Sequence, residues 1–497
     1  MTDLELQQLF TAFSAGRTPQ KQDFNASRMF TLLEDPFSIW CGFHAPPQEA
    51  VSEPNRYENL KIRTDRSARD AWIRQEFPSV LFISAASEEQ RFKATLTAMA
   101  QGERAIANAA LWNLDQHVYG SVNLLVRQDT APSRFGNYHY VVYQFKRAYD
   151  LKEHYRLQVA LLTQILGEIQ QYTPADALLC LKEHWEKVDF AAHRQRLNEE
   201  LIFWNNIRTG LAKPQAHKPP KAASAPWRVY ANRWVTQNKD LVLLPHLNIQ
   251  MRQFLKINGL FNTDDVAKVP LEKLQTILEE PYATETHYNA LAYWHNKPIL
   301  RQEGHFPPPS KKHNLYFDFE ATETFTKENK SFVYLIGLWD KEQDKYVTFV
   351  AKTPEEEISI FEQFYNYIQD FEDTILFHWT EYEVRKMKTL AGVYPQYAEH
   401  LNKLCSLCYD LKVCVNNAFY LPAPSFSLKA VAPIFGFNWR QDDCGAMDSM
   451  VYFTSWLKTG DESLLHKIFM YNEDDCKAML VVENALKQAE ILNPASL

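Results

Sequence analysis

Cysteine is scarce in this chain of 497 residues, which contains seven cysteines scattered along its length. An odd, dispersed set argues against a disulfide framework and favours a reducing compartment. Long apolar runs are also missing, since no stretch of about 18 apolar residues exists to cross a membrane. The opening residues MTDLELQQLF lack the basic and apolar regions of a secretory signal. We therefore expect a cytoplasmic protein without a membrane segment.

An excess of positive charge is absent as well. The chain has 53 lysines and arginines against 61 aspartates and glutamates, a formal net charge of −8. This balance excludes a generally basic protein that coats nucleic acid without specificity. It remains compatible with a local basic groove and with acidic residues gathered at a metal site.

Two proline-rich segments divide the chain. A single core rarely grows beyond about 250–300 residues, so this length predicts two to four domains. Residues 212–226 are rich in Pro, Ala and Lys and have no apolar periodicity. Residues 304–314 contain three consecutive prolines, which neither a helix nor a central strand accommodates. We predict three parts, at residues 1–211, 227–303 and 311–497.

The middle part is expected to be helical. Residues 247–278 predict a helix, a turn at Asn258 and Gly259, a helix capped at Thr263 or Asp264, and a short helix from residue 270. The pattern resembles a helix-hairpin-helix element, in which backbone N–H groups of the turn contact a phosphate. A small helical packing module fits the pattern equally well, so both interpretations stay open.

The C-terminal part begins with a strand that carries two acids. In NLYFDFEAT, Asp318 and Glu320 share one face, because alternate side chains of a strand point the same way. Two strand-like runs, SFVYLIGLWD and KYVTFVA, follow. Then come the helical pattern EEEISIFEQFYNYIQDF and the apolar run TILFHW. This order predicts an α/β fold of the RNase H-like kind, a mixed sheet flanked by helices.

Further chemically active side chains follow. Glu383 lies where the fourth strand turns into a helix. Tyr471 and Asp475 are four residues apart on a predicted amphipathic helix and share a face. Asp474 points about 100° away and is expected to meet solvent. Lys429 lies near the start of another predicted helix, within SFSLKAVAPIFGF.

These motifs resemble the DEDD exonuclease family, in the branch with a tyrosine in its third motif. D-x-E on the first strand, an acid after the fourth strand and Y-x-x-x-D on the last helix occur in the family's order. The stretches YNEDDCKAM and SFSLKAVAPIFGFNW also resemble the RNase H-like domain of a bacterial group of RecB-type nucleases. The resemblance covers residues 311–497 and implies a metal-dependent 3′–5′ exonuclease acting on DNA or RNA.

The resemblance assigns a role to each motif residue. It implies two divalent cations, Mg²⁺ or Mn²⁺, held by Asp318, Glu320, Glu383 and Asp475. Such cations neutralise carboxylates that otherwise repel one another. It makes Tyr471 the residue that orients the attacking water, and Lys429 is expected to contact nucleic acid. Glu383 stands where most of the family has aspartate, so this ligand is one methylene longer.

The N-terminal part resembles the PD-(D/E)xK nuclease fold of the same RecB-type group. Residues 98–128 are predicted as a helix followed by a strand, 138–148 as a strand and 155–166 as a helix. The resemblance places the catalytic acids of that fold on two strands. This sequence has Asn123 and Gln144 there.

Only the lysine of that former site remains, as Lys146. Amides bind Mg²⁺ poorly because they lack negative charge, so residues 1–211 are expected to be catalytically inactive. Lys146 and Arg147 are candidates for contacting nucleic acid. A purely structural domain is the alternative, and the sequence favours neither.

Besides the exonuclease, we consider two alternative functions and one alternative metal site. The chain could be a nucleic-acid end-binding protein that rarely cuts, or an adaptor whose nuclease-like domains serve protein assembly. Cys405, Cys408 and Cys414 suggest a metal site, but zinc needs four ligands and the other cysteines lie on different predicted elements. We expect buried thiols instead.

Overall fold

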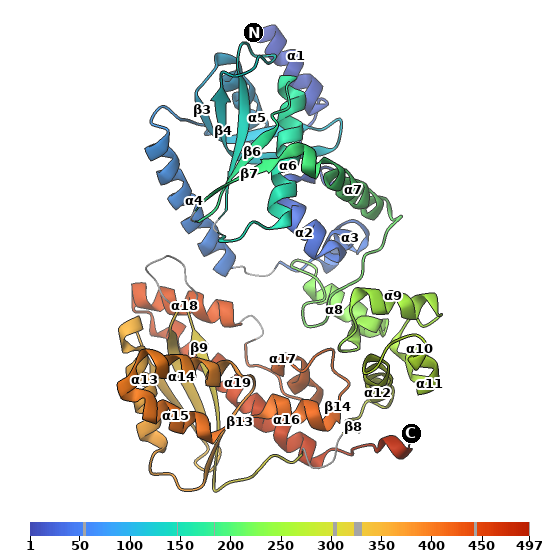
Figure 1. Cartoon of the computed structure of the whole chain (residues 1–497), viewed down its shortest axis with the longest axis vertical. Helices are drawn as coiled ribbons and strands as arrows, with labels where there is room; N and C mark the ends of the chain where they lie inside the picture. Colours follow the sequence, from blue (N-terminus) through green and yellow to red (C-terminus); the bar gives the residue numbers. More distant parts are fainter. Residues whose placement is uncertain are drawn as a thin grey trace. The chain divides into compact units, whose positions relative to one another are not determined.

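The chain is an α/β protein that folds as two compact units (Figure 1). Unit 1 comprises residues 1–50 and 61–215, and unit 2 comprises residues 51–60 and 216–497. The computed structural model describes residues 1–52, 56–146, 148–182, 184–301, 306–322, 331–441 and 445–496, and within these the side chains of 56–65 and 496 are not described. The predicted boundary between residues 211 and 227 includes the point where unit 1 ends.

Unit 1 is built on a seven-stranded sheet in the order β2-β3-β4-β5-β6-β7, with β1 paired to β4. The strands are β1 (Phe24–Asn25), β2 (Leu81–Phe82), β3 (Ala105–Asn113), β4 (Val118–Gln128), β5 (His139–Phe145), β6 (Asp176–Cys180) and β7 (Trp185–Asp189). The helices are α1 (Asp3–Ser14), α2 (Met29–Glu34), α3 (Pro36–His44), α5 (Glu88–Gln101), α6 (Glu153–Gln170) and α7 (Phe190–Thr209). Helix α4 (Arg56–Glu76) belongs to this unit from residue 61 onward.

The prediction of a helix and one strand for residues 98–128 was wrong in part, because α5 ends at Gln101 and two strands, β3 and β4, follow it. The alanines of the run that forms β3 favour a helix on intrinsic propensity. In the fold the run lies between β2 and β4, and all but one of its residues are buried. Tertiary burial therefore overrides local propensity. The strand predicted at 138–148 and the helix at 155–166 are confirmed as β5 and α6.

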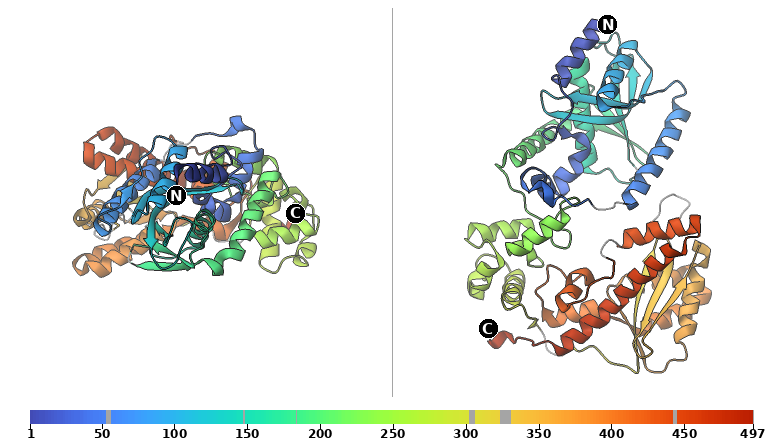
Figure 2. Two further views of the ribbon diagram at one scale, coloured as in Figure 1. Left: turned by 90° about the horizontal axis from the view of Figure 1, so that it is seen from above. Right: turned by 180° about the vertical axis from the view of Figure 1, so that it is seen from behind.

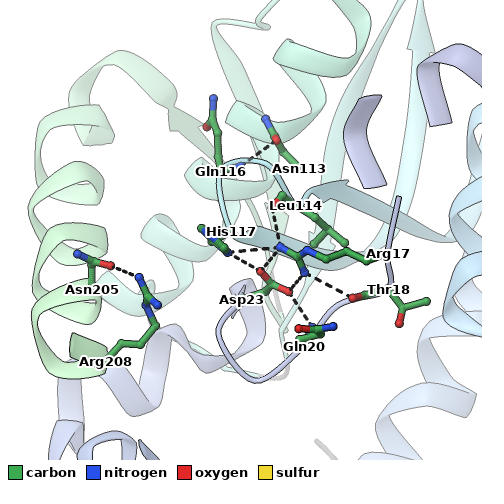
Figure 3. A network of polar contacts seen from close by, with 10 residues as sticks. All are labelled: Arg17, Thr18, Gln20, Asp23, Asn113, Leu114, Gln116, His117, Asn205 and Arg208. Carbon is green, nitrogen blue, oxygen red and sulfur yellow. Dashed lines mark hydrogen bonds and ion pairs between the residues drawn. The ribbon is translucent and has the colours of Figure 1, made fainter. Parts of the chain in front are cut away.

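A buried ion pair fastens the segment after α1 to the β3–β4 turn (Figure 3). The Asp23 side chain is fully buried and is bound by the Arg17 guanidinium, with 2.8 Å from Nη2 to Oδ1. Arg17 also donates to the Leu114 carbonyl at 2.7 Å, and His117 Nδ1 lies 2.8 Å from Asp23. Burial acts to raise the pKa of Asp23. The hydrogen bonds from Arg17, the Gln20 backbone and His117 nevertheless hold this pKa below its ordinary value.

Unit 2 starts with a helical subdomain, as predicted. Its helices are α8 (Arg228–Gln237), α9 (Ile249–Ile257), α10 (Thr263–Ala267), α11 (Leu271–Gln275) and α12 (Tyr282–His295). The cap of α10 is Asn262, one residue before the predicted positions, and it forms a capping box with Asp265. Among the described residues of the chain, no helix combines the length and apolar character needed to cross a bilayer.

The rest of unit 2 is built on a five-stranded mixed sheet in the order β11-β10-β9-β12-β13. Its strands are β9 (His313–Ala321), β10 (Val333–Asp340), β11 (Lys345–Val350), β12 (Thr374–His378) and β13 (Cys408–Asp410), and β8 (Ile299–Leu300) pairs separately with β14 (Phe419–Tyr420). Its helices are α13 (Glu357–Ile368), α14 (Tyr382–Val393), α15 (Ala398–Leu407), α16 (Leu411–Ala418), α17 (Leu428–Val431), α18 (Ala446–Thr459) and α19 (Glu462–Gln488). The predicted order of three strands, a helix and a strand is confirmed as β9, β10, β11, α13 and β12.

The two faces of this sheet bury different helices, except that α19 contributes residues to both cores. Leu315, Phe317 and Phe319 pack in a core with residues of α13, α14, α15 and α18. Tyr316 packs in the opposite core with residues of α16 and α19. The long helix α19 crosses that second face (Figure 2). Because side chains alternate along β9, Asp318 and Glu320 lie on the same side as Tyr316 and face α19.

We expect Arg17→Ala to destabilise unit 1 strongly. The substitution leaves the buried Asp23 carboxylate without its cationic partner, and breaking such a pair typically costs about 3–5 kcal/mol. Native-state hydrogen exchange of amides in β3 and β4 measures the free energy of unfolding.

Arg104→Ala is the matched control for that experiment. Arg104 pairs with Asp129 in the same unit, but both side chains are largely exposed. Loss of an exposed pair costs about 1 kcal/mol or less. Equal destabilisation by both substitutions would contradict the role of the Asp23 network.

Candidate metal centre

Three carboxylates meet between β9 and α19. Asp318, Glu320 and Asp475 each offer one oxygen, and these oxygens all lie within 4.8 Å of one another. Two of the acids come from alternate positions of β9, and the third comes from the helix that crosses this face of the sheet. The convergence therefore follows from strand periodicity together with the docking of α19.

Burial and mutual repulsion make this cluster hard to ionise. Burial first, and then the charges of Asp475 and Glu320, raise the pKa of Asp318 well above its ordinary value. Burial and the charge of Asp475 raise the pKa of Glu320 to about 8. Burial also raises the pKa of Asp475. Hard oxygen donors in this arrangement fit a divalent cation such as Mg²⁺ or Mn²⁺, which removes the repulsion.

A neutral hydrogen-bond donor lies beside each carboxylate. Asn472 Nδ2 donates to Asp318 Oδ2 at 3.0 Å, and Trp439 Nε1 donates to Asp475 Oδ1 at 2.6 Å. The Tyr334 hydroxyl lies 3.5 Å from Glu320 Oε2. Donors of this kind fix the orientation of carboxylates that bind metal ions.

Lys429 contributes a positive charge at the edge of the cluster. Its Nζ lies 3.9 Å from Asp475 Oδ1, 3.8 Å from the centre of the Trp439 ring and 4.6 Å from that of Tyr471. Its charge lowers the pKa of all three clustered acids, against the larger effect of burial on each of them. The side chain is 37% exposed, so it is accessible to an anionic substrate beside the carboxylates.

Tyr471 lies one helical turn before Asp475, as predicted, and is buried. Its hydroxyl hydrogen-bonds with Asp475 and thereby acts to lower the pKa of that acid. Burial, followed by the charge of Asp475, raises the pKa of Tyr471 above its ordinary value. The hydroxyl is therefore a protonated donor within the cluster at neutral pH.

Glu383 does not join the group of three carboxylates. It lies in the first turn of α14 and is 4% exposed. Its Oε2 accepts from Thr380 Oγ1 at 3.3 Å and lies 3.6 Å from His378 Nδ1. Its charge still raises the pKa of Asp318, so the carboxylate lies beside the cluster. The role predicted for Glu383 as a metal ligand remains a prediction.

Asp474 does not meet solvent, contrary to the sequence-based prediction. It is 3% exposed, and the Arg440 side chain and backbone both donate to its carboxylate at 2.7 Å. Arg440 also binds Glu473 at 2.7 Å. The loop after α17 thus contacts α19. Trp439 donates a hydrogen bond to Asp475, and Arg440 binds the two preceding acids, Glu473 and Asp474. Helical geometry alone could not predict this loop.

In unit 1, the amide side chains of Asn123 and Gln144 have structural hydrogen bonds. Asn123 N–H donates to Gln144 Oε1 at 2.8 Å, and Phe145 N–H donates to Asn123 Oδ1 at 2.9 Å. The two side chains thus satisfy backbone groups of β4 and β5. Within the described part of unit 1, no group of three His, Cys, Asp or Glu side chains is close enough to hold a metal ion.

Lys146 is partly buried beside these amides. Its Nζ donates to Gln158 Oε1 at 2.7 Å and lies 4.9 Å from the centre of the Tyr155 ring. Burial lowers the pKa of Lys146 to about 8. Arg147, the other predicted nucleic-acid contact here, lies outside the described residues.

The turn after α9 has few donors left for a phosphate. Gly259 and Leu260 N–H groups each donate at 3.0 Å to carbonyls of the preceding turn. Phe261 and Asn262 N–H groups donate to the Asp265 carboxylate. Acidic residues also occupy the first turn of α10 and repel an anion. These contacts favour the packing-module interpretation over phosphate binding.

The alternative site at Cys405, Cys408 and Cys414 is not a group that could hold a metal ion among the described residues. Cys414 is buried, and Cys405 and Cys408 are partly buried. Burial raises the pKa of each of these thiols, which keeps them neutral. The prediction of buried thiols is therefore confirmed for Cys414 and only in part for Cys405 and Cys408.

Sequence reasoning missed three donors of the cluster, Asn472, Trp439 and Tyr334. A signal for Asn472 existed, because it lies three residues before Asp475 on the same helix and thus on a neighbouring face. Trp439 lies in a loop, where no periodicity relates it to the acids. Only the folded chain brings its indole to Asp475.

One family comparison bears on this site. The family model of the RNase H superfamily matches residues 315–487, which include β9 and most of α19. No curated protein matches the chain. The C-terminal domain is therefore an RNase H-like domain, and its acidic cluster, able to hold a metal ion, indicates a nuclease that acts on nucleic acid.

Proposed function

We propose that residues 311–497 form a 3′–5′ exonuclease that hydrolyses phosphodiester bonds of DNA or RNA with two divalent cations, Mg²⁺ or Mn²⁺. The main support is that Asp318, Glu320 and Asp475 meet within an RNase H-like fold. The buried Tyr471 lies one helical turn before Asp475 on the same helix. The cations would neutralise the carboxylates and stabilise the charge that develops on the attacking and leaving oxygens.

The protein's own residues would perform three tasks. Asp318, Glu320 and Asp475 would bind the cations, and Glu383, whose charge acts on Asp318, would complete the set. The Tyr471 hydroxyl hydrogen-bonds the attacking water and orients it toward phosphorus. Lys429 attracts the phosphate to the open side of the cluster.

Unit 1 would contribute to substrate binding and not to cleavage. Lys146 retains its amine beside Gln158, whereas Asn123 and Gln144 are committed to backbone hydrogen bonds. A cation on Lys146 can contact a phosphate without any metal.

An end-binding protein without appreciable cleavage is the second candidate. One observation favours it: Glu383 lies outside the three-carboxylate group and is bound by Thr380. A site with three acids can bind a cation without completing the catalytic arrangement. Turnover with Mg²⁺ or Mn²⁺ separates the candidates, since an end-binding protein retains affinity and shows no cleavage.

Asp318→Ala should abolish nearly all hydrolysis while the chain stays folded. The loss of hydrolytic activity in this variant should exceed the roughly 10–100-fold loss typical of substitutions at residues that support the metal ligands. Because the substitution removes a repelling acid, the melting temperature in EDTA should hold or rise. Cleavage of labelled single- and double-stranded DNA and RNA measures the outcome.

Lys146→Ala is the control for Asp318→Ala. It should leave the cleavage rate per bound substrate unchanged, although binding can weaken. If Lys146→Ala eliminates cleavage and Asp318→Ala does not, the active site lies in the other unit.

Tyr471→Phe should lower turnover by about 10²–10³-fold, the usual loss for one positioned donor. The ring and its packing remain, so Mn²⁺ affinity and substrate affinity should change little. Single-turnover cleavage and calorimetric Mn²⁺ titration test this together. A parallel loss of metal binding and activity would instead show that the hydroxyl serves mainly to hold Asp475.

Metal stabilisation of the chain should grow with pH. Since Glu320 has a pKa of about 8 in the fold against an ordinary value of 4.5, the folded state keeps a proton that the unfolded state loses. The metal-free protein therefore loses stability as pH rises from about 4.5 to about 8. Cations bind the deprotonated cluster, so Mg²⁺ should raise the melting temperature more at about pH 8.5 than at about pH 5.5.

Glu320→Gln is the control for this pH dependence. The variant lacks the titrating carboxyl, so its melting temperature in EDTA should depend less on pH. An equal effect of Mg²⁺ at both pH values in the unmodified chain would contradict metal binding at the raised-pKa cluster.

A further inference from the structure

A buried amide connects the metal centre to the sheet behind it. Asn472, on α19, is 0% exposed. Its Nδ2 lies 3.0 Å from Asp318 Oδ2 and 3.3 Å from the Asp318 backbone carbonyl oxygen. Its Oδ1 accepts a hydrogen bond from the Tyr346 hydroxyl at 2.8 Å. Both ends of the amide are thus engaged.

Gly337 provides the space that this amide occupies. Gly337 lies on β10 directly opposite Asp318 in the β9–β10 register. A Cβ at this position would lie 1.6 Å from Asn472 Oδ1 and 2.6 Å from the Tyr346 hydroxyl oxygen. No side chain therefore fits at Gly337 while Asn472 contacts Asp318.

The partners also fix which end of the amide faces the acid. The Tyr346 hydroxyl donates to Oδ1, so the N–H₂ end is directed at Asp318. A rotated amide would place its carbonyl oxygen against the carboxylate, and two acceptors repel each other. Asn472 therefore presents a donor to one oxygen of Asp318 and leaves the other oxygen for a cation.

We propose that Asn472 is a positioning residue of the metal centre, held in place by Gly337 and Tyr346. The proposal rests on the metal-dependent cleavage proposed above. Asn472 fixes the Asp318 carboxylate on β9, and the helix that carries Asn472 also carries Asp475 three residues later. The contact therefore sets the separation between ligands that belong to different elements.

Asn472→Ala tests the proposal against a matched buried asparagine. The variant should lower Mn²⁺ affinity and kcat, each by about 10–100-fold, with KM nearly unchanged. Asn289 on α12 is also 0% exposed and donates to a backbone carbonyl at 2.7 Å. Asn289→Ala should lower the melting temperature and leave Mn²⁺ affinity and kcat intact. The proposal is overturned if Asn472→Ala also changes only the melting temperature.

Gly337→Ala supplies an independent test. Its methyl group displaces the amide, so Mn²⁺ affinity should fall as in Asn472→Ala. In the double variant only the Tyr346 hydroxyl, 2.6 Å from the added methyl carbon, still has to shift, so the Mn²⁺ affinity should fall little further. Additive losses would show that Gly337 and Asn472 act separately, and would overturn the proposed arrangement. Tyr346→Phe should produce a smaller loss in the same direction, and it serves if the other variants do not fold.

The readouts separate this inference from the proposed function. If the unmodified chain binds Mn²⁺ but cleaves no substrate, the exonuclease proposal fails, and the affinity changes still test Asn472. If the unmodified chain binds no Mn²⁺, both proposals fail.

Discussion

Repulsion among three closely spaced carboxylates is the constraint on which the C-terminal domain depends. Asp318, Glu320 and Asp475 bring oxygens within 4.8 Å of one another, and burial raises the pKa of each of these acids. Such a group is unfavourable for the folded state as long as it is ionised and unpaired. The fold must supply enough packing energy elsewhere to hold it. The large apolar clusters on both faces of the five-stranded sheet provide that energy.

Helix α19 has the central role in this arrangement. One part of it packs against Tyr316 and Phe377 through Cys476, Met479 and Val482. The same helix presents Asn472 and Asp475 to the acids of β9. Since packing and site chemistry depend on one rigid element, the geometry of the cluster is set by the core.

The sequence predicted the C-terminal fold well because its signals are local. Alternation along β9 placed both acids on one face, and helical spacing placed Tyr471 beside Asp475. Prediction failed where tertiary contacts decide. An alanine-rich run became the buried strand β3, and Asp474 became buried because Arg440 reaches it from a loop.

The amides of Asn123 and Gln144 in unit 1 show the same limit. The sequence indicated that Asn123 and Gln144 cannot hold a metal ion, but not that their amides bond to backbone groups of β4 and β5. Likewise, the sequence predicted a Gly-containing turn after α9. It could not predict that N–H groups following this turn donate hydrogen bonds to Asp265 of the next helix.

The most direct test of the account is to locate Mn²⁺ in crystals of the full chain by its anomalous scattering. The account predicts density bonded to Asp318, Glu320 and Asp475, between β9 and α19. Strong Mn²⁺ density at other side chains, with none at these three acids, would contradict the assignment of the metal centre.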